Sequence, residues 1–364
     1  MMWAIVKEEW RSVWRDEGVV LIVVFALFIY GVSYSLGYGG EVLNEVPIAV
    51  VGGEQGAKSR ELVRMFDASP KLNVEYEAVD MAEAEQLLRA RKVWGIVALS
   101  PDLERDVLSG RQARVAILGD ASYFLAYREV AEGAVATIQQ MNEQIIVERK
   151  GVYNPPIIYQ QRNLFNPSLG YGIFVMPAII LLILQQTALI GVGMVSATRR
   201  ERSLRYRSHS ACVVTIGRTV VYLALYALTL GFMLTVHYSL FDYPMRGAWW
   251  RCVAVIVPYL LAVIFLAQAL GALFRRRESS IVWLLWLSIP FLLVSGVSLP
   301  PEAFPQWLYI IGRAVPSSSA VDAWIAVQSK GALLSDVLPE LALLWCLVLV
   351  YGAGAVMANR NSHL

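Results

Sequence analysis

Six long apolar runs constrain the fold of this chain more than any other feature of its sequence. Each run has roughly 18 or more residues with few charges, which is the length an α-helix needs to cross a bilayer. The runs cover 19–36, 170–197, 213–236, 250–274, 281–299 and 338–357. Hydrophobic residues make up 57% of the chain and charged residues 16%, against about 45–50% and about 25% in soluble domains. The sequence therefore predicts an α-helical polytopic membrane protein.

The charge balance excludes one large class of function. The chain has 31 Lys and Arg residues and 29 Asp and Glu residues, so its formal net charge is +2. A nucleic-acid-binding protein needs a basic surface to neutralise phosphates, and this balance does not indicate one. Eleven Trp and 17 Tyr residues are instead typical of a protein with two membrane–water interfaces.

The segment 38–169, between the first and second runs, does not look like a membrane sequence. It contains 18 of the 29 acidic residues and 14 of the 31 basic ones. Its pattern predicts strands and helices in alternation, at 47–51, 59–66, 72–79, 81–91, 93–99, 101–108, 114–118 and 122–150. We therefore expect an α/β domain inserted between transmembrane helices 1 and 2, with the six spans in a 1+5 arrangement.

The positions of Lys and Arg in the short loops predict the orientation in the membrane. One set of loops and termini holds Lys7, Arg11, Arg15, Arg199, Arg200, Arg202, Arg205, Arg207, Arg275, Arg276, Arg277 and Arg360. The opposite set holds only Arg246, Arg251, Arg313 and Lys330. We expect both termini to be cytoplasmic and residues 38–169 to be extracytoplasmic, in a multi-pass membrane protein whose first span (18–37) is an uncleaved signal anchor.

Residues 1–17 are amphipathic at helical spacing. Trp3, Trp10 and Trp14 share one face with two Val residues, and charged residues lie opposite. Three Trp side chains on an apolar face suit the headgroup layer of a membrane. The pattern predicts an interfacial elbow helix that lies flat before the first span; the alternative is a cytoplasmic extension packed on another protein.

No motif in the chain indicates catalysis or metal binding. The loop from Gly52 to Ser59 resembles a phosphate-binding loop, but Ala57 stands where that motif needs Gly, so we interpret it as a strand-to-helix turn. The three His residues lack metal-ligand spacing. The three Cys residues lie in or beside spans and form no metal or disulfide pattern, as expected of packing residues. We expect no catalytic residue, no metal and no cofactor held by this chain.

The densest charged patch lies after the second span, in a cytoplasmic loop at 198–210. It includes Arg199, Arg200, Glu201, Arg202 and Ser203. Positive-inside topology would explain the Arg residues, whereas Glu201 contributes little to topology. The loop is therefore either an ordinary topogenic cluster or a docking site for a cytoplasmic partner, and the residues alone do not decide between the two.

Two further features concern the membrane region. Residues 299–328 contain clustered prolines and a short Trp- and Tyr-bearing stretch, which predict a re-entrant or interfacial segment. Gln185, Gln186 and Gln268 lie inside spans, where an unpaired amide is costly. We expect these three side chains to face other helices or a polar translocation path rather than lipid.

The order of these features resembles the membrane subunits of ABC-2 type ABC exporters, in the branch with a large extracytoplasmic domain. The resemblance covers essentially the whole chain. The residues that carry it are Asn166-Pro167, Gln185-Gln186, Arg199-Arg200-Glu201-Arg202-Ser203-Leu204, Gly217-Arg218, Ser295-Gly296, Pro300-Pro301, Phe304-Pro305, Trp307-Leu308 and Pro316.

The resemblance implies a permease subunit in a bacterial inner membrane, five helices after the large domain (170–364), and an amphipathic or hydrophobic substrate such as a drug, lipid or lipid-linked glycan. Two permease copies would form the path, each with a separate ATPase subunit that uses ATP and Mg²⁺ and contacts the 198–210 loop. A periplasmic adaptor protein is a further possible partner, besides membrane lipids. Nucleic acid is not an expected partner.

Two other classes of function remain open at this point. One is a membrane-anchored sensor or envelope interaction protein, in which the α/β domain binds a ligand and the spans transmit the signal. The other is a membrane enzyme acting on lipid-linked substrates, for which the candidate acids are Asp242, Glu302 and Asp322.

Overall fold

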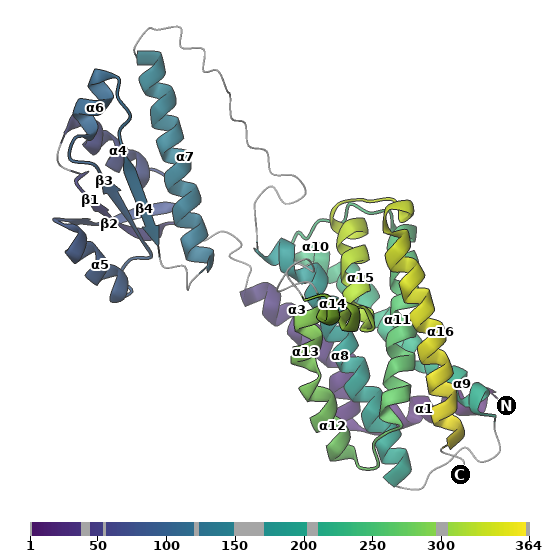
Figure 1. Ribbon diagram of the computed structural model, residues 1–364. Coiled ribbons are helices and arrows are strands. Elements are labelled where there is room, and N and C mark those ends of the chain that lie inside the picture. Colours follow the sequence, from purple (N-terminus) through teal and green to yellow (C-terminus); the bar gives the residue numbers. More distant parts are fainter. Residues whose placement is uncertain are drawn as a thin grey trace. The chain divides into compact units, whose positions relative to one another are not determined.

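The chain divides into two compact units. The computed structural model describes residues 2–37, 44–53, 56–119, 124–148, 171–201, 210–295 and 305–361. One unit consists of Met1–Gly39 with Leu164–Leu364, and the other of Gly40–Asn163. The first unit is a bundle of helices and the second contains a β-sheet (Figure 1).

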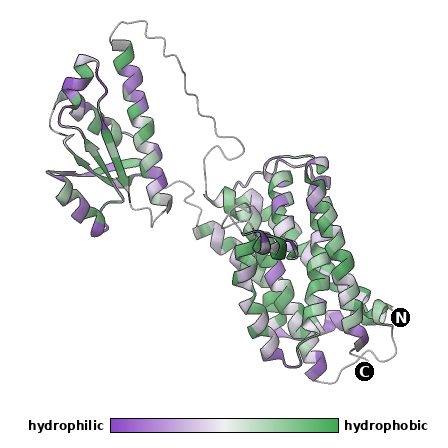
Figure 2. Cartoon of the chain, viewed as in Figure 1, coloured by the Kyte–Doolittle hydropathy of each residue, from purple (hydrophilic) through white to green (hydrophobic). Residues whose placement is uncertain are grey.

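The helical unit has six helices long and apolar enough to cross a membrane within the described residues. These are Glu17–Gly37, Gly172–Glu201, Ala211–Leu240, Trp249–Gly271, Arg277–Val294 and Leu334–Arg360. Apolar residues cover most of their length (Figure 2). In chain order one precedes the sheet-containing unit and five follow it. The predicted polytopic helical fold is thus confirmed.

A short amphipathic helix precedes the first of these spans. Helix α1 (Met2–Trp14) ends before Asp16, whose side-chain Oδ1 accepts a hydrogen bond from Val19 N at 3.2 Å and so caps the next helix. The first span then runs through α2 (Glu17–Val20), a π-helical stretch at Leu21–Phe25 and α3 (Ala26–Gly37). The cap fixes the turn between α1 and the span.

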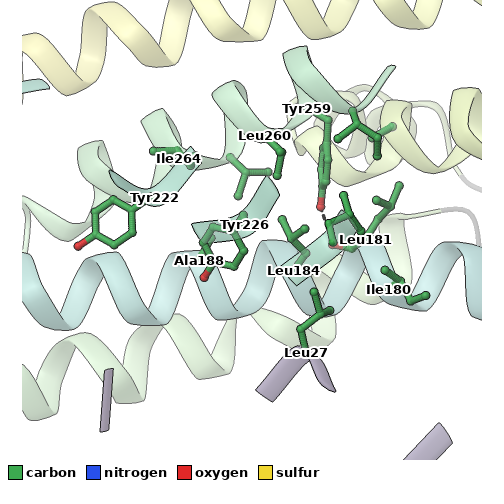
Figure 3. Packing of buried hydrophobic residues seen from close by; sticks show 14 of the residues in the cluster. Leu27, Ile180, Leu181, Leu184, Ala188, Tyr222, Tyr226, Tyr259, Leu260 and Ile264 are labelled. Carbon is green, nitrogen blue, oxygen red and sulfur yellow. Dashed lines mark hydrogen bonds between the residues drawn. The ribbon is translucent and has the colours of Figure 1, made fainter. Parts of the chain in front are cut away.

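The centre of the helical unit is formed by α8 (Tyr171–Glu201), α9 (Ala211–Phe232) and α11 (Trp249–Gly271). Figure 3 shows Tyr222 and Tyr226 of α9, Tyr259 of α11 and the leucines of α8 packed together. The Tyr259 hydroxyl donates a hydrogen bond to the carbonyl of Leu181, so the apolar interior satisfies this polar group. Helix α16 (Leu338–Asn361) lies along α11.

The fifth span and the helices after it differ in detail from the expected ranges. The span consists of α12 (Arg277–Trp286) and α13 (Ser288–Val294), so it begins earlier than the predicted 281–299. Within the predicted segment 299–328, the structure describes α14 (Gln306–Arg313) and α15 (Pro316–Trp324), which is followed by a π-helical stretch. Residues 299–304 lie outside the described residues. Both helices are too short to span a bilayer.

The second unit has a four-stranded sheet in the order β2-β1-β3-β4. Its elements are β1 (Val46–Val51), α4 (Ala57–Asp67), β2 (Leu72–Ala78), α5 (Met81–Arg89), β3 (Gly95–Leu99), α6 (Leu103–Ser109), β4 (Val115–Gly119) and α7 (Phe124–Glu148). Strand β1 is parallel to β2 and β3, whereas the edge strand β4 is antiparallel to β3. Each strand lies within two residues of its predicted range.

The two faces of the sheet are covered unequally. Ile48, Val50 and Val97 pack with α4, α6 and α7 on one face. On the other face, within the described residues, Ala49 and Ile96 pack with α5. Because residues of a strand point alternately to opposite faces, a central strand buried on both sides must be apolar throughout, as β1 is.

Candidate coupling site between helix α1 and the bundle

A fully buried carboxylate anchors α1 to the membrane helices. Glu9 has 0% relative exposure. Its Oε2 lies 2.7 Å from Arg199 Nη2 of α8, and its Oε1 lies 3.0 Å from Arg218 Nε of α9. The Tyr222 hydroxyl of α9 donates a hydrogen bond to the same Oε1 at 2.8 Å. One carboxylate therefore joins α1 to two spans through charge-assisted hydrogen bonds.

The contacts of Arg218 extend this cluster to two more spans. Arg218 Nη2 donates to Ser196 Oγ of α8 at 2.7 Å, and its Nη1 to Asn359 Oδ1 of α16 at 3.4 Å. Asn359 Nδ2 in turn donates to Thr215 Oγ1 at 2.8 Å. Gln268 Nε2 of α11 donates to the Thr219 hydroxyl at 2.8 Å and lies beside Asn359.

We call these residues the Glu9 network: Glu9, Ser196, Arg199, Thr215, Arg218, Thr219, Tyr222, Gln268 and Asn359. It joins α1, α8, α9, α11 and α16, and its charged members are shielded from solvent. In such surroundings satisfied hydrogen bonds are strong and unsatisfied ones are costly. The network therefore makes the position of α1 depend on the positions of four spans.

The electrostatics of Glu9 favour its charged form. Burial by itself raises the pKa of this carboxyl, but the guanidinium groups of Arg218 and Arg199, with the Tyr222 hydroxyl, more than offset it. The pKa of Glu9 is lowered from 4.5 to about 2. Glu9 is thus a carboxylate at neutral pH.

This depressed pKa predicts acid sensitivity. The stability that Glu9 contributes is fully present above its unfolded-state pKa of 4.5 and is lost as the pH falls from there toward about 2. We expect the apparent Tm of the detergent-solubilised protein to fall more steeply below pH 4.5 than that of a Glu9→Gln variant. Parallel curves for the two proteins would show that Glu9 carries no linked proton.

A second ion pair ties the other end of α1. Asp16 accepts hydrogen bonds from both terminal nitrogens of Arg277, the first charged residue of α12, one of them at 2.7 Å. Burial tends to raise the pKa of Asp16, but the hydrogen bonds from Arg277 and from Val19 N lower it below its usual value. Helix α1 is therefore linked to the second and third spans near its middle and to the fifth span beyond its end.

The residues predicted for partner docking are only partly described. Arg199 is 8% exposed and turns toward α1, where Nη1 lies 3.2 Å from Glu8 and Nη2 donates to Ser12 at 3.1 Å. Arg200 donates to the carbonyl of Ala272 at the end of α11. Glu201, the last residue of α8, is exposed. Arg202 and Ser203 lie outside the described residues.

The three intramembrane glutamines all contact another helix. Gln185 Oε1 accepts a hydrogen bond from Ser317 N of α15 at 3.0 Å, and the Gln186 amide donates to the carbonyl of Leu284 in α12. Gln185 and Gln186 also line a cavity of about 520 Å³ between α3, α8 and the fifth span. Gln268 belongs to the Glu9 network instead. The cavity is otherwise mostly apolar, with Tyr30 and Tyr34 at its wall.

The Trp residues of α1 do not lie on the face that packs against the bundle. That face is formed by Ile5, Glu9 and Val13, all buried, whereas Trp3, Trp10 and Trp14 are exposed. The sequence pattern predicted that the charges lie opposite the apolar face. It missed Glu9, which lies between Ile5 and Val13 at a spacing of four residues. The sequence does contain one indication of the partner of Glu9. Arg218 is the single charge inside the third apolar run.

The structure describes most of the other candidate groups. The acid proposed for enzyme chemistry at Asp322 lies 3.3 Å from Arg313, Asp242 lies in a turn with a positive φ, and Glu302 is outside the described residues. At the loop that resembles a phosphate site, the Glu104 carboxylate accepts from Ala57 N at 3.1 Å, at the N-terminus of α4. Within the described ranges no His, Cys, Asp and Glu side chains group as a metal site.

The fold and this site define a multi-pass membrane protein whose N-terminal amphipathic helix is ion-paired to its spans. The chain belongs to the ABC-2 family of transporter proteins, whose family model matches residues 18–357.

Its similarity to individual relatives extends over nearly their full length. The chain is 20% identical over 364 residues, or 99% of its length and 98% of the relative, to the "Probable multidrug ABC transporter permease YbhR" of Escherichia coli K12. It is 23% identical over 341 residues to the "Inner membrane transport permease YhhJ" of Escherichia coli K12, covering 92% of this chain and 90% of the relative. No solved structure matches the chain with significant similarity.

Proposed function

We propose that this chain is the membrane permease subunit of an ABC exporter in a bacterial inner membrane. The Glu9 network is the observation that carries the proposal. It joins α1 to four spans, so a movement of α1 caused by a cytoplasmic partner would also move those spans. Membership of the ABC-2 family and the names of the two relatives, a multidrug ABC transporter permease and an inner membrane transport permease, support the same function.

The proposed mechanism uses α1 as a lever. A partner ATPase that binds and hydrolyses ATP with Mg²⁺ docks on the cytoplasmic side, at the loop that follows Arg200 and the exposed Glu201. Movement of the end of α8 is transmitted to α1 through the ion pair of Arg199 with Glu9. From the end of α1 it is transmitted to α12 through the ion pair of Asp16 with Arg277. Because these contacts are short and mostly shielded, the helices move together between two arrangements of the bundle.

We propose an orientation in the membrane from the charged residues at the two ends of the bundle. The end that holds the Glu9 network also holds Arg200, Arg277 and Arg360, whereas Arg246 and Arg251 contact the chain near Gln328 and Gly331 at the other end. By the positive-inside rule the α1 end is cytoplasmic. This orientation would place both termini in the cytoplasm and the unit Gly40–Asn163 outside it.

The cavity beside Gln185 and Gln186 is the proposed start of the substrate path. Its apolar wall with a few amide and phenol groups suits an amphipathic or hydrophobic substrate, such as a drug, lipid or lipid-linked glycan. It lies beside the first and fifth spans, in which only 33% and 11% of the most apolar stretch is buried. A second permease copy, identical or homologous, is proposed to cover these faces, and a periplasmic adaptor protein to bind the α/β unit.

Capture of the ATPase tests the proposal. We expect the wild-type chain, purified from its native membrane, to retain an ABC ATPase, and Glu201→Lys to lose it, because the reversed charge lies at the proposed docking loop. Glu143→Lys, the same change at an exposed site of α7, is the matched control. Gln186→Leu should retain the ATPase but alter the stimulation of ATP hydrolysis by hydrophobic substrates.

A chain that never captures an ATPase, and whose cellular function survives Glu201→Lys, would contradict the permease assignment. That result would favour the alternative function, a membrane-anchored sensor or envelope interaction protein whose α/β domain binds a ligand.

A further inference from the structure

Helix α1 presents a large aromatic surface on the side that faces away from the bundle. Trp3, Trp10 and Trp14 are 76%, 42% and 47% exposed. Their spacing of seven and four places them on one helical face, and the rings of Trp10 and Trp14 are in contact, with centroids 5.7 Å apart. Three exposed indoles on one helical face need an apolar or interfacial cover rather than bulk water.

A row of basic residues runs beside this aromatic surface. Lys7, Arg11 and Arg15 recur every four residues and are exposed. At 100° per residue the row lies next to the Trp face and away from the buried face. In the part of the chain that the structure describes, no ion pair joins these three residues to an acidic group. Three uncompensated positive charges thus flank three exposed Trp side chains.

The buried face fixes the direction in which both rows point. Ile5 and Val13 have almost no exposure, and Glu9 is bound to Arg199 and Arg218. The exposed acid of the helix, Glu8, lies 3.2 Å from Arg199 on the side toward α8. Rotation of α1 about its axis would break the Glu9 network. The helix therefore cannot rotate to bury its Trp residues or to place Glu8 beside the basic row.

We propose that the exposed face of α1 binds the headgroups of anionic phospholipids. The Trp rings lie at the level between headgroups and acyl chains, and the Lys and Arg side chains contact the lipid phosphates. Arg offers paired donors that match phosphate oxygens, and Lys acts as a point charge. Trp is favoured at this depth of a membrane, whereas an acidic protein segment would match the charges but leave the indoles without a suitable partner.

Hydrogen exchange of the full-length protein in nanodiscs measures this binding locally. We compare discs of phosphatidylcholine with discs of an equal mixture of phosphatidylcholine and phosphatidylglycerol. In the mixture we expect amides of residues 2–14 to exchange at least about fivefold more slowly, since each basic residue near an anionic surface contributes roughly this factor to affinity. Lys7→Gln/Arg11→Gln/Arg15→Gln should abolish the difference between the two lipids.

The control variant removes the same number of charges elsewhere. Arg64, Lys92 and Arg111 are exposed in the α/β unit, and their replacement by Gln should leave the lipid-dependent protection of α1 unchanged. Protection of α8 and α11 serves as the check that every variant is folded.

Three results would overturn the proposal. The first is equal exchange of α1 in both kinds of disc. The second is loss of the lipid effect in the control variant. The third is protection reproduced by glycerol phosphate added to phosphatidylcholine discs, which would assign the basic row to a soluble phosphate. ATPase capture does not depend on this contact alone, so failure here leaves the proposed transport function to its own test.

Discussion

Replacing Glu9 with Gln is expected to lower the stability of the helical unit by about 3–5 kcal/mol. The neutral amide leaves Arg199 and Arg218 without their shared carboxylate, and Arg218 has only 4% relative exposure. Without its partner, a buried charge has lost its hydration and gains no ion pair to offset that loss. Thermal unfolding of the purified protein in detergent, followed by intrinsic fluorescence, measures the effect as a large drop in apparent Tm.

The neighbouring residue provides a matched control. Glu8→Gln makes the same chemical change one position earlier, at a side chain that is 54% exposed and also contacts Arg199. Exposed ion pairs contribute about 0–1 kcal/mol, so this variant should unfold close to the wild-type temperature. Equal shifts for the two variants would mean that the Glu9 network does not hold α1 in place.

Replacing Trp324 with Ala is expected to have the second large effect. Trp324 of α15 has 0% exposure and belongs to the main cluster of buried side chains in the helical unit. In detergent the unfolded chain also surrounds the ring with hydrocarbon, so loss of apolar transfer energy contributes little. The unfilled cavity remains, and at roughly 24 cal/mol per Å³ it costs about 3 kcal/mol.

Trp286→Ala tests whether burial is the cause. Trp286 of α12 is 73% exposed within the same unit, and its removal leaves no internal cavity. We expect a clear reduction of the apparent Tm for Trp324→Ala, an intermediate one for Trp324→Phe, and almost none for Trp286→Ala. A shift of equal size at both positions would show that Trp324 is not part of a tightly packed interior.

The fold was largely predictable because its strongest signals are local. The apolar runs locate six spans, since length and hydropathy act within one segment. The strands of the α/β unit follow from short apolar runs between turn residues. The antiparallel direction of β4 was not predictable, because strand direction depends on pairing with β3 rather than on the residues of β4. The early start of the fifth span reflects the pairing of Arg277 with Asp16, which lets a charged residue open the helix.

The candidate site was harder to predict because it depends on contacts between distant residues. The charged loop after the second span is visible in the sequence, but the direction of Arg199 is not. It is decided by Glu9, about 190 positions earlier in the chain, whose burial no local pattern indicates. A single acid between apolar residues on α1 and a single Arg in the third span are each ambiguous alone. Only the folded bundle shows that they neutralise each other.

The length of chain between these partners has a consequence for synthesis in the cell. Glu9 and Arg218 are 209 residues apart, and at about 5–20 residues per second the ribosome needs roughly 10–40 s to make the intervening chain. Until α8 and α9 have been made, Glu9 has neither of its Arg partners. We expect α1 to remain unattached to the bundle while the α/β unit is synthesised, and to form the Glu9 network only after the third span has been made.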